Sequence, residues 1–132
     1  FIDVSRRAAQ LMPKGGTLIT LTFQGSNRVT PNYNVMGVAK AALESSVRYL
    51  ANDLGPQGIR VNAVSPGPIL TRAASGIASF DELMDSAIRK SPLGRLVTLE
   101  EIAGLTTFLC SDAASGMTGQ TLYVDAGYHA VD

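Results

Sequence analysis

Apolar and polar residues follow two different spacings along this chain. Residues 1–12 place their apolar side chains on one broad side of a helix, and the Pro-Lys-Gly-Gly segment at 13–16 then ends it. Residues 17–23 (TLITLTF) combine β-branched and apolar residues without a charge, a pattern typical of a buried strand. The segment 59–65 (IRVNAVS), which has a mixed periodicity, indicates a second strand, and 121–125 (TLYVD) indicates a third. The chain is therefore predicted to contain three strands.

Helices are predicted between these strands. Thr30 is interpreted as the N-cap of a long helix over residues 31–54, with proline at its first position and a Gly-Pro pair as its stop. Two short helical pieces are expected after the second strand, and a capping box at 79–82 (SFDE) opens the second of them. Another capping box, TLEE, starts a helix over residues 98–110.

The order of these elements predicts an α/β fold. Near-continuous apolar strands that alternate with helices indicate a parallel sheet with helices on both faces, the doubly wound arrangement. The sequence contains no internal repeat and no low-complexity tract, so no domain boundary is placed inside it. Doubly wound sheets usually have about five strands or more, so we expect further strands of the same domain outside this sequence.

Composition narrows the function classes. At 132 residues, with 45% hydrophobic and 17% charged residues, the chain can build one domain core. Eleven basic residues balance 11 acidic ones, and no run approaches the ~18 apolar residues of a membrane span, so neither nucleic acid nor a membrane is an expected partner. The single cysteine, Cys110, excludes an internal disulfide and is interpreted as a small buried hydrophobe in a cytoplasmic protein. The lone histidine, His129, is interpreted as a surface residue, and no metal site is predicted.

One pair of residues on the long predicted helix carries candidate chemistry. Tyr33 and Lys40 are seven positions apart, which on an α-helix places them about 10.5 Å apart along the axis and on the same side. A nearby ammonium favours the ionised phenol and strengthens the phenol as a hydrogen-bond donor to a developing oxyanion, while the ammonium can also bind a ribose diol. A tyrosine and a lysine seven positions apart on a helix are common by chance. The second strand, however, leads into Pro66-Gly67-Pro68 at its carboxyl end, where ligands bind in open parallel sheets.

Two stretches resemble a known family. PNYNVMGVAKAALESSVRYLANDLGPQGIRVNAVSPGPILT and LGRLVTLEEIAGLTTFLCSDAASGMTGQTLYVDAG are similar to the C-terminal half of the short-chain dehydrogenase/reductase superfamily. Within that superfamily the chain resembles the enoyl-acyl carrier protein reductases of bacterial fatty acid synthesis. Ketone-reducing members carry Tyr-x3-Lys, whereas Tyr33 is followed four places later by Gly37, and the x6 spacing to Lys40 is the discriminating feature.

The resemblance implies roles for the matching positions. Tyr33 would hydrogen-bond a thioester carbonyl while hydride from NADH, with NADPH as the alternative cofactor, reaches the β-carbon, and Lys40 would hold the nicotinamide ribose. The cofactor loop would consist of Gly67, Pro68, Ile69 and Thr71, with the backbone of Ile69 at the carboxamide and Thr71 near the pyrophosphate. The substrate pocket would be lined by Phe23, Met36, Ile77 and Phe80. Many such reductases have a second tyrosine at the position of Phe23, so here the hydrogen bonding would rest on Tyr33.

The resemblance also implies partners. The substrate would be an enoyl group on an acyl carrier protein, and the subunit would assemble into a homotetramer through the outer faces of helices 31–54 and 98–110. No Gly-rich turn lies between a first strand and a first helix in this sequence. We therefore expect residues 1–132 to be the C-terminal half of a single Rossmann-type reductase domain whose N-terminal half carries the dinucleotide fingerprint and selects NADH or NADPH.

Two alternatives stay open at this point. Another member of the superfamily could reduce a carbonyl, although the Tyr-x6-Lys spacing counts against it. A non-catalytic NAD(P)-binding regulator could use the same scaffold, although the presence of Tyr33 and Lys40 counts against that reading.

Overall fold

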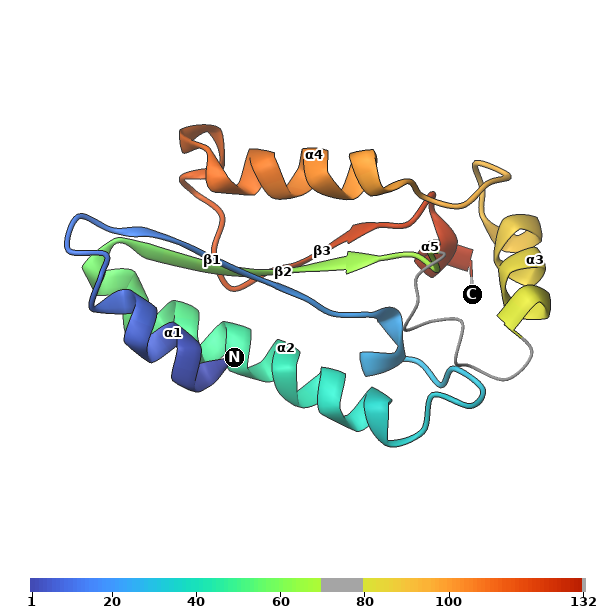
Figure 1. The fold of residues 1–132 in the computed structure, drawn as a ribbon, viewed down its shortest axis with the longest axis horizontal. Coiled ribbons are helices and arrows are strands. Elements are labelled where there is room, and N and C mark those ends of the chain that lie inside the picture. Colours follow the sequence, from blue (N-terminus) through green and yellow to red (C-terminus); the bar gives the residue numbers. More distant parts are fainter. Residues whose placement is uncertain (70–79, 132) are drawn as a thin grey trace.

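A computed structural model of the chain describes residues 1–69 and 80–131. Helices and strands alternate along these residues (Figure 1): α1 (Ile2–Ala9), β1 (Gly16–Leu21), η1 (Gln24–Ser26), α2 (Val35–Leu54), η2 (Gly55–Gln57), β2 (Ile59–Pro66), α3 (Phe80–Lys90), α4 (Leu99–Cys110), η4 (Asp112–Ala114), β3 (Thr121–Val124) and α5 (Tyr128–Val131).

The three strands form one parallel sheet in the order β1-β2-β3. Gly16 of β1 pairs with Ile59 of β2, and the register runs to Leu21 opposite Val64. Because all three strands point the same way, their carboxyl ends meet at one edge of the sheet. The three strands predicted from the sequence, and their parallel arrangement, are confirmed.

Helices cover both faces of this sheet (Figure 1). α1 and α2 lie on one face, where Val61 and Ala63 of the central strand pack against Val47 and Leu50 of α2. α4 lies on the other face, where Val64 packs in a second apolar cluster. Burial on both faces explains why the polar side chains of Asn62 and Ser65 in β2 are as buried as its apolar ones. The doubly wound α/β class is therefore confirmed.

The start of the long helix differs from the prediction. α2 begins at Val35 rather than at residue 31, and residues 31–34 form turns. Asn32 and Asn34 have positive φ angles of 63° and 46°, which asparagine adopts more often than most other non-glycine residues. Thr30 is therefore not the N-cap. The predicted end of the helix, at residue 54, is confirmed.

The capping box of α4 is confirmed atom by atom. The backbone N–H of Glu101 donates to the Thr98 hydroxyl at 3.3 Å, and the backbone N–H of Thr98 donates to the Glu101 carboxylate at 2.9 Å. α3 corresponds to the second short helix expected from the sequence, whereas the first falls within 70–79, outside the described residues.

Some local features were not predicted from the sequence. Residues 24–26 form the 3₁₀ turn η1, and a short helix, α5, follows β3. Cys110 is exposed rather than buried, because it occupies the last position of α4 beyond the apolar cluster. Across residues 1–69 and 80–131, no helix combines the length and apolarity needed to cross a bilayer.

Candidate functional site

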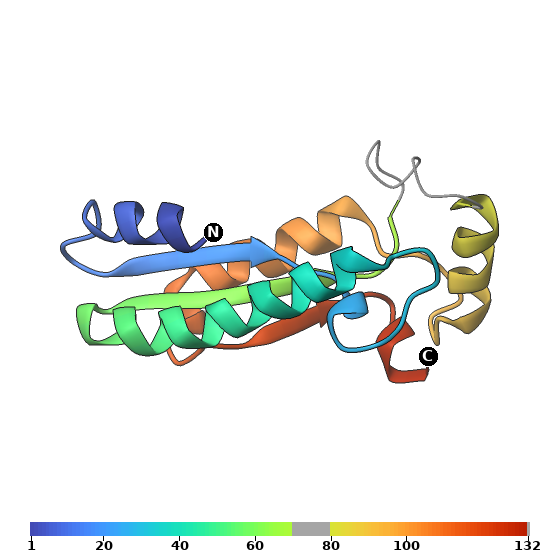
Figure 2. The same cartoon turned by 90° about the horizontal axis from the view of Figure 1, so that it is seen from below.

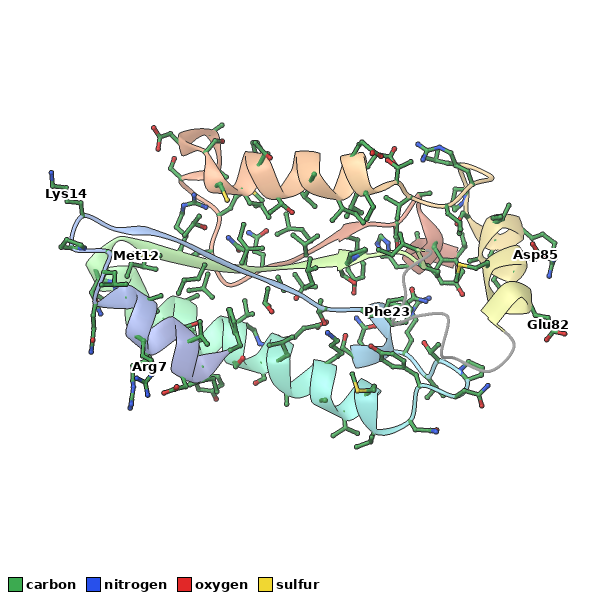
Figure 3. The ribbon with its side chains drawn as sticks, in the orientation of Figure 1. Arg7, Met12, Lys14, Phe23, Glu82 and Asp85 are labelled. Carbon is green, nitrogen blue, oxygen red and sulfur yellow. The ribbon has the colours of Figure 1, made fainter. Side chains whose placement is uncertain are left out.

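Four segments gather at the carboxyl edge of the sheet. η1 and the 27–34 turn follow β1, residues 67–69 follow β2, α5 follows β3, and α3 lies at the same end of the molecule (Figures 1 and 2). The basic residues Arg7 and Lys14 lie at the opposite end, whereas Phe23 lies at the carboxyl edge and Glu82 and Asp85 project outward from α3 (Figure 3). Ligands of open parallel sheets bind at this edge.

The Tyr33 ring packs against η1. It makes an edge-to-face contact with Phe23, with ring centroids 5.2 Å apart. A Cβ atom added to Gly25 would lie 2.6 Å from the Tyr33 ring, so only glycine allows this close approach. Sequence reasoning did not single out Gly25, and a lone glycine in a polar segment offered no signal for it.

The Tyr33 phenol is a hydrogen-bond donor at neutral pH. Its pKa is raised above the ordinary 10.0 because the side chain is partly buried. This direction is opposite to the one expected from the sequence, where a lysine nearby was to favour the ionised form. A protonated phenol donates a hydrogen bond, which is the role that an oxyanion at this position requires.

Lys40 reaches the end of β1 from the second turn of α2. Its Nζ donates a hydrogen bond to the backbone oxygen of Leu21 at 3.0 Å. Because Tyr33 precedes α2, the helical spacing between Tyr33 and Lys40 does not apply, and that part of the sequence argument was wrong. Both residues nevertheless lie at the carboxyl edge of the sheet. The Tyr33 ring packs against η1, and Lys40 is hydrogen-bonded to Leu21, the last residue of β1.

A buried polar pair lies one helical turn beyond Lys40. The Thr22 hydroxyl donates to the Glu44 carboxylate at 2.7 Å, and both side chains are buried. Together with the bond from Lys40, this pair holds α2 against the last residues of β1. Sequence reasoning missed it, although a glutamate four residues after Lys40 on the same side of a small-residue helix was a usable signal.

The loop after β2 is pinned to β3. The N–H of Gly67 donates to the Val124 oxygen at 3.1 Å, and a Cβ atom on Gly67 would lie 2.9 Å from the Asp125 Cβ. Pro68 is buried, and the Ile69 side chain packs on the apolar cluster beneath α4. The side chains of this loop therefore anchor it, and its backbone is held at the edge where the nicotinamide contact is expected.

The remaining predicted residues are placed as follows. Met36, in the first turn of α2, is 48% exposed. Phe80 is the first residue of α3. Thr71 and Ile77 lie outside the described residues.

A cavity of about 510 Å³ opens beside Tyr33. It is lined by residues 25–34 together with Gly37, Val38 and Ala41 of α2. Its volume falls within the range of small-molecule sites, ~300–1,000 Å³. Within residues 1–69 and 80–131, no three side chains of His, Cys, Asp or Glu form a group that could hold a metal ion.

The residues at this edge fit a nicotinamide ribose. The Lys40 ammonium has three N–H donors, and the Leu21 oxygen accepts from one of them, which leaves donors for a vicinal diol. Because Gly67 has no Cβ atom, the backbone of this loop can lie close to Asp125, directly after β3, at the same edge. A doubly wound parallel sheet that presents such groups at its carboxyl edge is typical of the Rossmann-type oxidoreductases.

Comparison with known proteins identifies the family. The family model described as Enoyl-(Acyl carrier protein) reductase matches residues 1–129, and the chain belongs to this family. A protein named enoyl-(acyl-carrier-protein) reductase (NADH) 2 from Rhizobium meliloti is 54% identical over 129 residues, which are 98% of this chain and 48% of that relative.

Solved structures of the same family are similar to this chain. The Bacillus cereus enoyl-acyl carrier protein reductase with NADP+ and indole naphthyridinone is similar at a TM-score of 0.96 and 50% identity, covering 99% of this chain and 51% of that one. The Anaplasma phagocytophilum enoyl-(acyl-carrier-protein) reductase in complex with NAD has a TM-score of 0.92 and 50% identity, covering 97% of this chain and 49% of that one. The chain thus spans about half the length of the relatives it matches.

Proposed function

We propose that residues 1–132 are the C-terminal half of a single Rossmann-type reductase domain, and that the whole protein reduces the 2,3 double bond of enoyl-acyl carrier protein thioesters. The cofactor is NADH, after the relatives that are named for it. The observation that carries the proposal is the protonated, half-buried phenol of Tyr33 at the edge that Lys40 also reaches.

Tyr33 acts on the substrate oxygen. NADH, when bound, supplies a hydride to the β-carbon of the enoyl thioester. Negative charge then moves to the thioester carbonyl oxygen, and the phenol of Tyr33 donates a hydrogen bond to that oxygen as the charge forms. A solvent proton at the α-carbon completes the reduction. Because Phe23 has no hydroxyl, the phenyl ring shapes the site and leaves the hydrogen bonding to Tyr33.

The other residues bind and orient. Lys40 holds the nicotinamide ribose through the donors that Leu21 does not use. Residues 67–69 place backbone groups at the carboxamide. From the family resemblance, we assign Thr71 to the pyrophosphate and Phe23, Met36, Ile77 and Phe80 to the acyl chain.

The assembly is a cytoplasmic homotetramer in this proposal. Large apolar side chains on α2, Val35, Val38 and Tyr49, are at least 70% exposed, and they support burial of this helix against another subunit. A free, exposed Cys110 is consistent with a reducing compartment.

The test uses the full-length protein. NADH oxidation is measured with a 2-enoyl thioester of acyl carrier protein, with a 3-ketoacyl thioester as the control substrate and NADPH as the control cofactor. We expect activity on the enoyl substrate. Activity on the ketone alone would establish the carbonyl reductase, and NADH binding without turnover of either substrate would establish the regulator.

Two variants assign the roles. Tyr33→Phe should lower kcat while the Kd for NADH stays that of the parent, because the phenol contacts only the substrate oxygen. Lys40→Ala should raise the Kd for NADH. If both variants behaved like the parent, the two roles would be wrong.

A further inference from the structure

A chain of four side chains runs across the carboxyl edge of the sheet, from the C-terminal helix to the turn that carries Tyr33. The Asn27 amide donates to the Tyr123 hydroxyl at 2.8 Å, although 96 positions separate the two residues. The Tyr123 ring stacks on the His129 imidazole, with centroids 3.8 Å apart and planes 9° apart. The His129 Nδ1 lies 2.7 Å from the Asp125 carboxylate. None of these four residues has a role in the function proposed above.

Asp125 is the fixed end of this chain. Its side chain is 5% exposed, and its carboxylate accepts from the backbone N–H groups of Gly127 and His129 at 3.0 and 2.8 Å. An ionised carboxylate only accepts, so Nδ1 of His129 carries the proton of their shared hydrogen bond. The imidazole is thereby held in one orientation, in which it stacks on Tyr123. His129 was expected at the surface, and its side chain is 37% exposed, but its contacts with Asp125 and Tyr123 were not predicted.

Asn27 is the end that touches the candidate site. It is the C-cap of η1, and its backbone N–H donates to the Gln24 oxygen at 3.0 Å. Within that same turn, Gly25 lies directly beneath the Tyr33 ring. A displacement of Asn27 therefore moves the surface on which Tyr33 rests.

We propose that Asn27 and Tyr123 are positioning residues for Tyr33, and that the stacked His129 and its partner Asp125 keep Tyr123 in place. The proposal rests on the proposed function for its kinetic consequence, because Tyr33 must reach a substrate oxygen. The positioning itself is independent of any reaction. Neither Asn27 nor Tyr123 belongs to the two buried apolar clusters, so the hydrogen bond between them contributes orientation more than stability.

A double-mutant cycle on the full-length protein tests the link. Asn27→Ala and Tyr123→Phe each remove one partner of the same hydrogen bond, and each should lower kcat by about fivefold, because a small shift of η1 misplaces the Tyr33 phenol. The double variant should be no slower than the slower single variant, because the bond is lost only once. The Kd for NADH and the melting temperature should stay those of the parent.

The matched control removes a similar bond elsewhere. Asn52 on α2 donates to Asp53 at 3.2 Å, far along the chain from the carboxyl edge, and Asn52→Ala should leave kcat unchanged. Single effects that multiply in the double variant, or a kcat equal to that of the parent in both single variants, would overturn the proposal.

A second readout does not depend on activity. The pKa of the Tyr33 phenol can be followed by NMR on tyrosine labelled at Cζ and assigned with Tyr33→Phe. In the parent we expect it above the ordinary 10.0, because the side chain is partly buried. It should fall toward 10.0 in Asn27→Ala and in Tyr123→Phe as the ring leaves η1. If the parent reduced no enoyl thioester but this shift occurred, the proposed function would fail and the positioning would stand. An unchanged pKa in both variants would overturn the positioning.

Discussion

Gly37 and Gly25 share one contact that decides where Tyr33 lies. A Cβ atom on Gly37 would lie 2.6 Å from the backbone oxygen of Gly25, and ordinary contact begins at 3.4 Å. The change Gly37→Ala therefore forces η1 away from α2. A backbone carbonyl in a 3₁₀ turn cannot rotate aside as a side chain does, so the turn moves as a unit and takes the surface beneath Tyr33 with it.

Gly37→Ala should affect the free energy of unfolding much less than it affects kcat. Overpacking costs roughly 1–3 kcal/mol, and the higher helix propensity of alanine offsets roughly 0.8–1.0 kcal/mol of it. The net loss in the free energy of unfolding is then at most about 2 kcal/mol. A misplacement of about 1 Å at a reacting group can lower kcat about 100-fold. We therefore expect Gly37→Ala to lose activity far beyond its loss of stability.

The assay compares two glycine variants of the full-length protein. Gly55, at the end of α2, has φ −55° and ψ −43° and no atom within 4 Å of an added Cβ, so Gly55→Ala should keep the parental kcat and gain roughly 0.4–1 kcal/mol. Denaturant unfolding gives the stabilities, and NADH oxidation gives kcat under conditions in which both variants are folded. A Gly37→Ala protein with the kcat of the Gly55→Ala control would refute the reasoning.

Two further predictions concern the polar pairs. Thr22→Val removes the hydroxyl that donates to the buried Glu44, and it should lower the free energy of unfolding, measured in urea, by roughly 1–3 kcal/mol. Thr22→Ser keeps a hydroxyl and should stay near the parent. Equal stability of the two variants would contradict the role of the bond. The pKa of Glu101 is about 2, below the ordinary 4.5, because the Arg95 side chain and the Thr98 N–H donate to it. Its contribution to stability is therefore present above pH 4.5 and lost as the pH falls toward 2, and it is small because the pair is exposed. Melting temperatures between these pH values should fall less steeply in Glu101→Gln than in the parent, and parallel curves would count against the pairing.

Local patterns predicted the elements well. The capping box at Thr98 and Glu101, the β-branched residues of β2 and the stop after residue 54 are each local patterns of a few neighbouring residues, so the sequence displays them directly. The parallel sheet followed from the alternation of these elements.

The details of the site depended on distant contacts. Residues 31–34 carry helix-start signals, but α2 begins only at Val35, because Gly37 contacts η1 and the two preceding asparagines have positive φ angles. The direction of the Tyr33 pKa shift depends on burial, which the spacing to Lys40 does not reveal. The bond between Asn27 and Tyr123 joins positions 96 apart, and no local pattern predicts it.

The hydrogen bond from Lys40 to Leu21 has a thermodynamic consequence for ligand affinity. A free lysine side chain loses about 1.5–2 kcal/mol of rotamer entropy when it becomes ordered. Because the Leu21 oxygen already restrains the ammonium in the folded protein, much of that ordering precedes the arrival of any diol. The ligand meets a preorganised cation, and more of its contact energy is expressed as affinity.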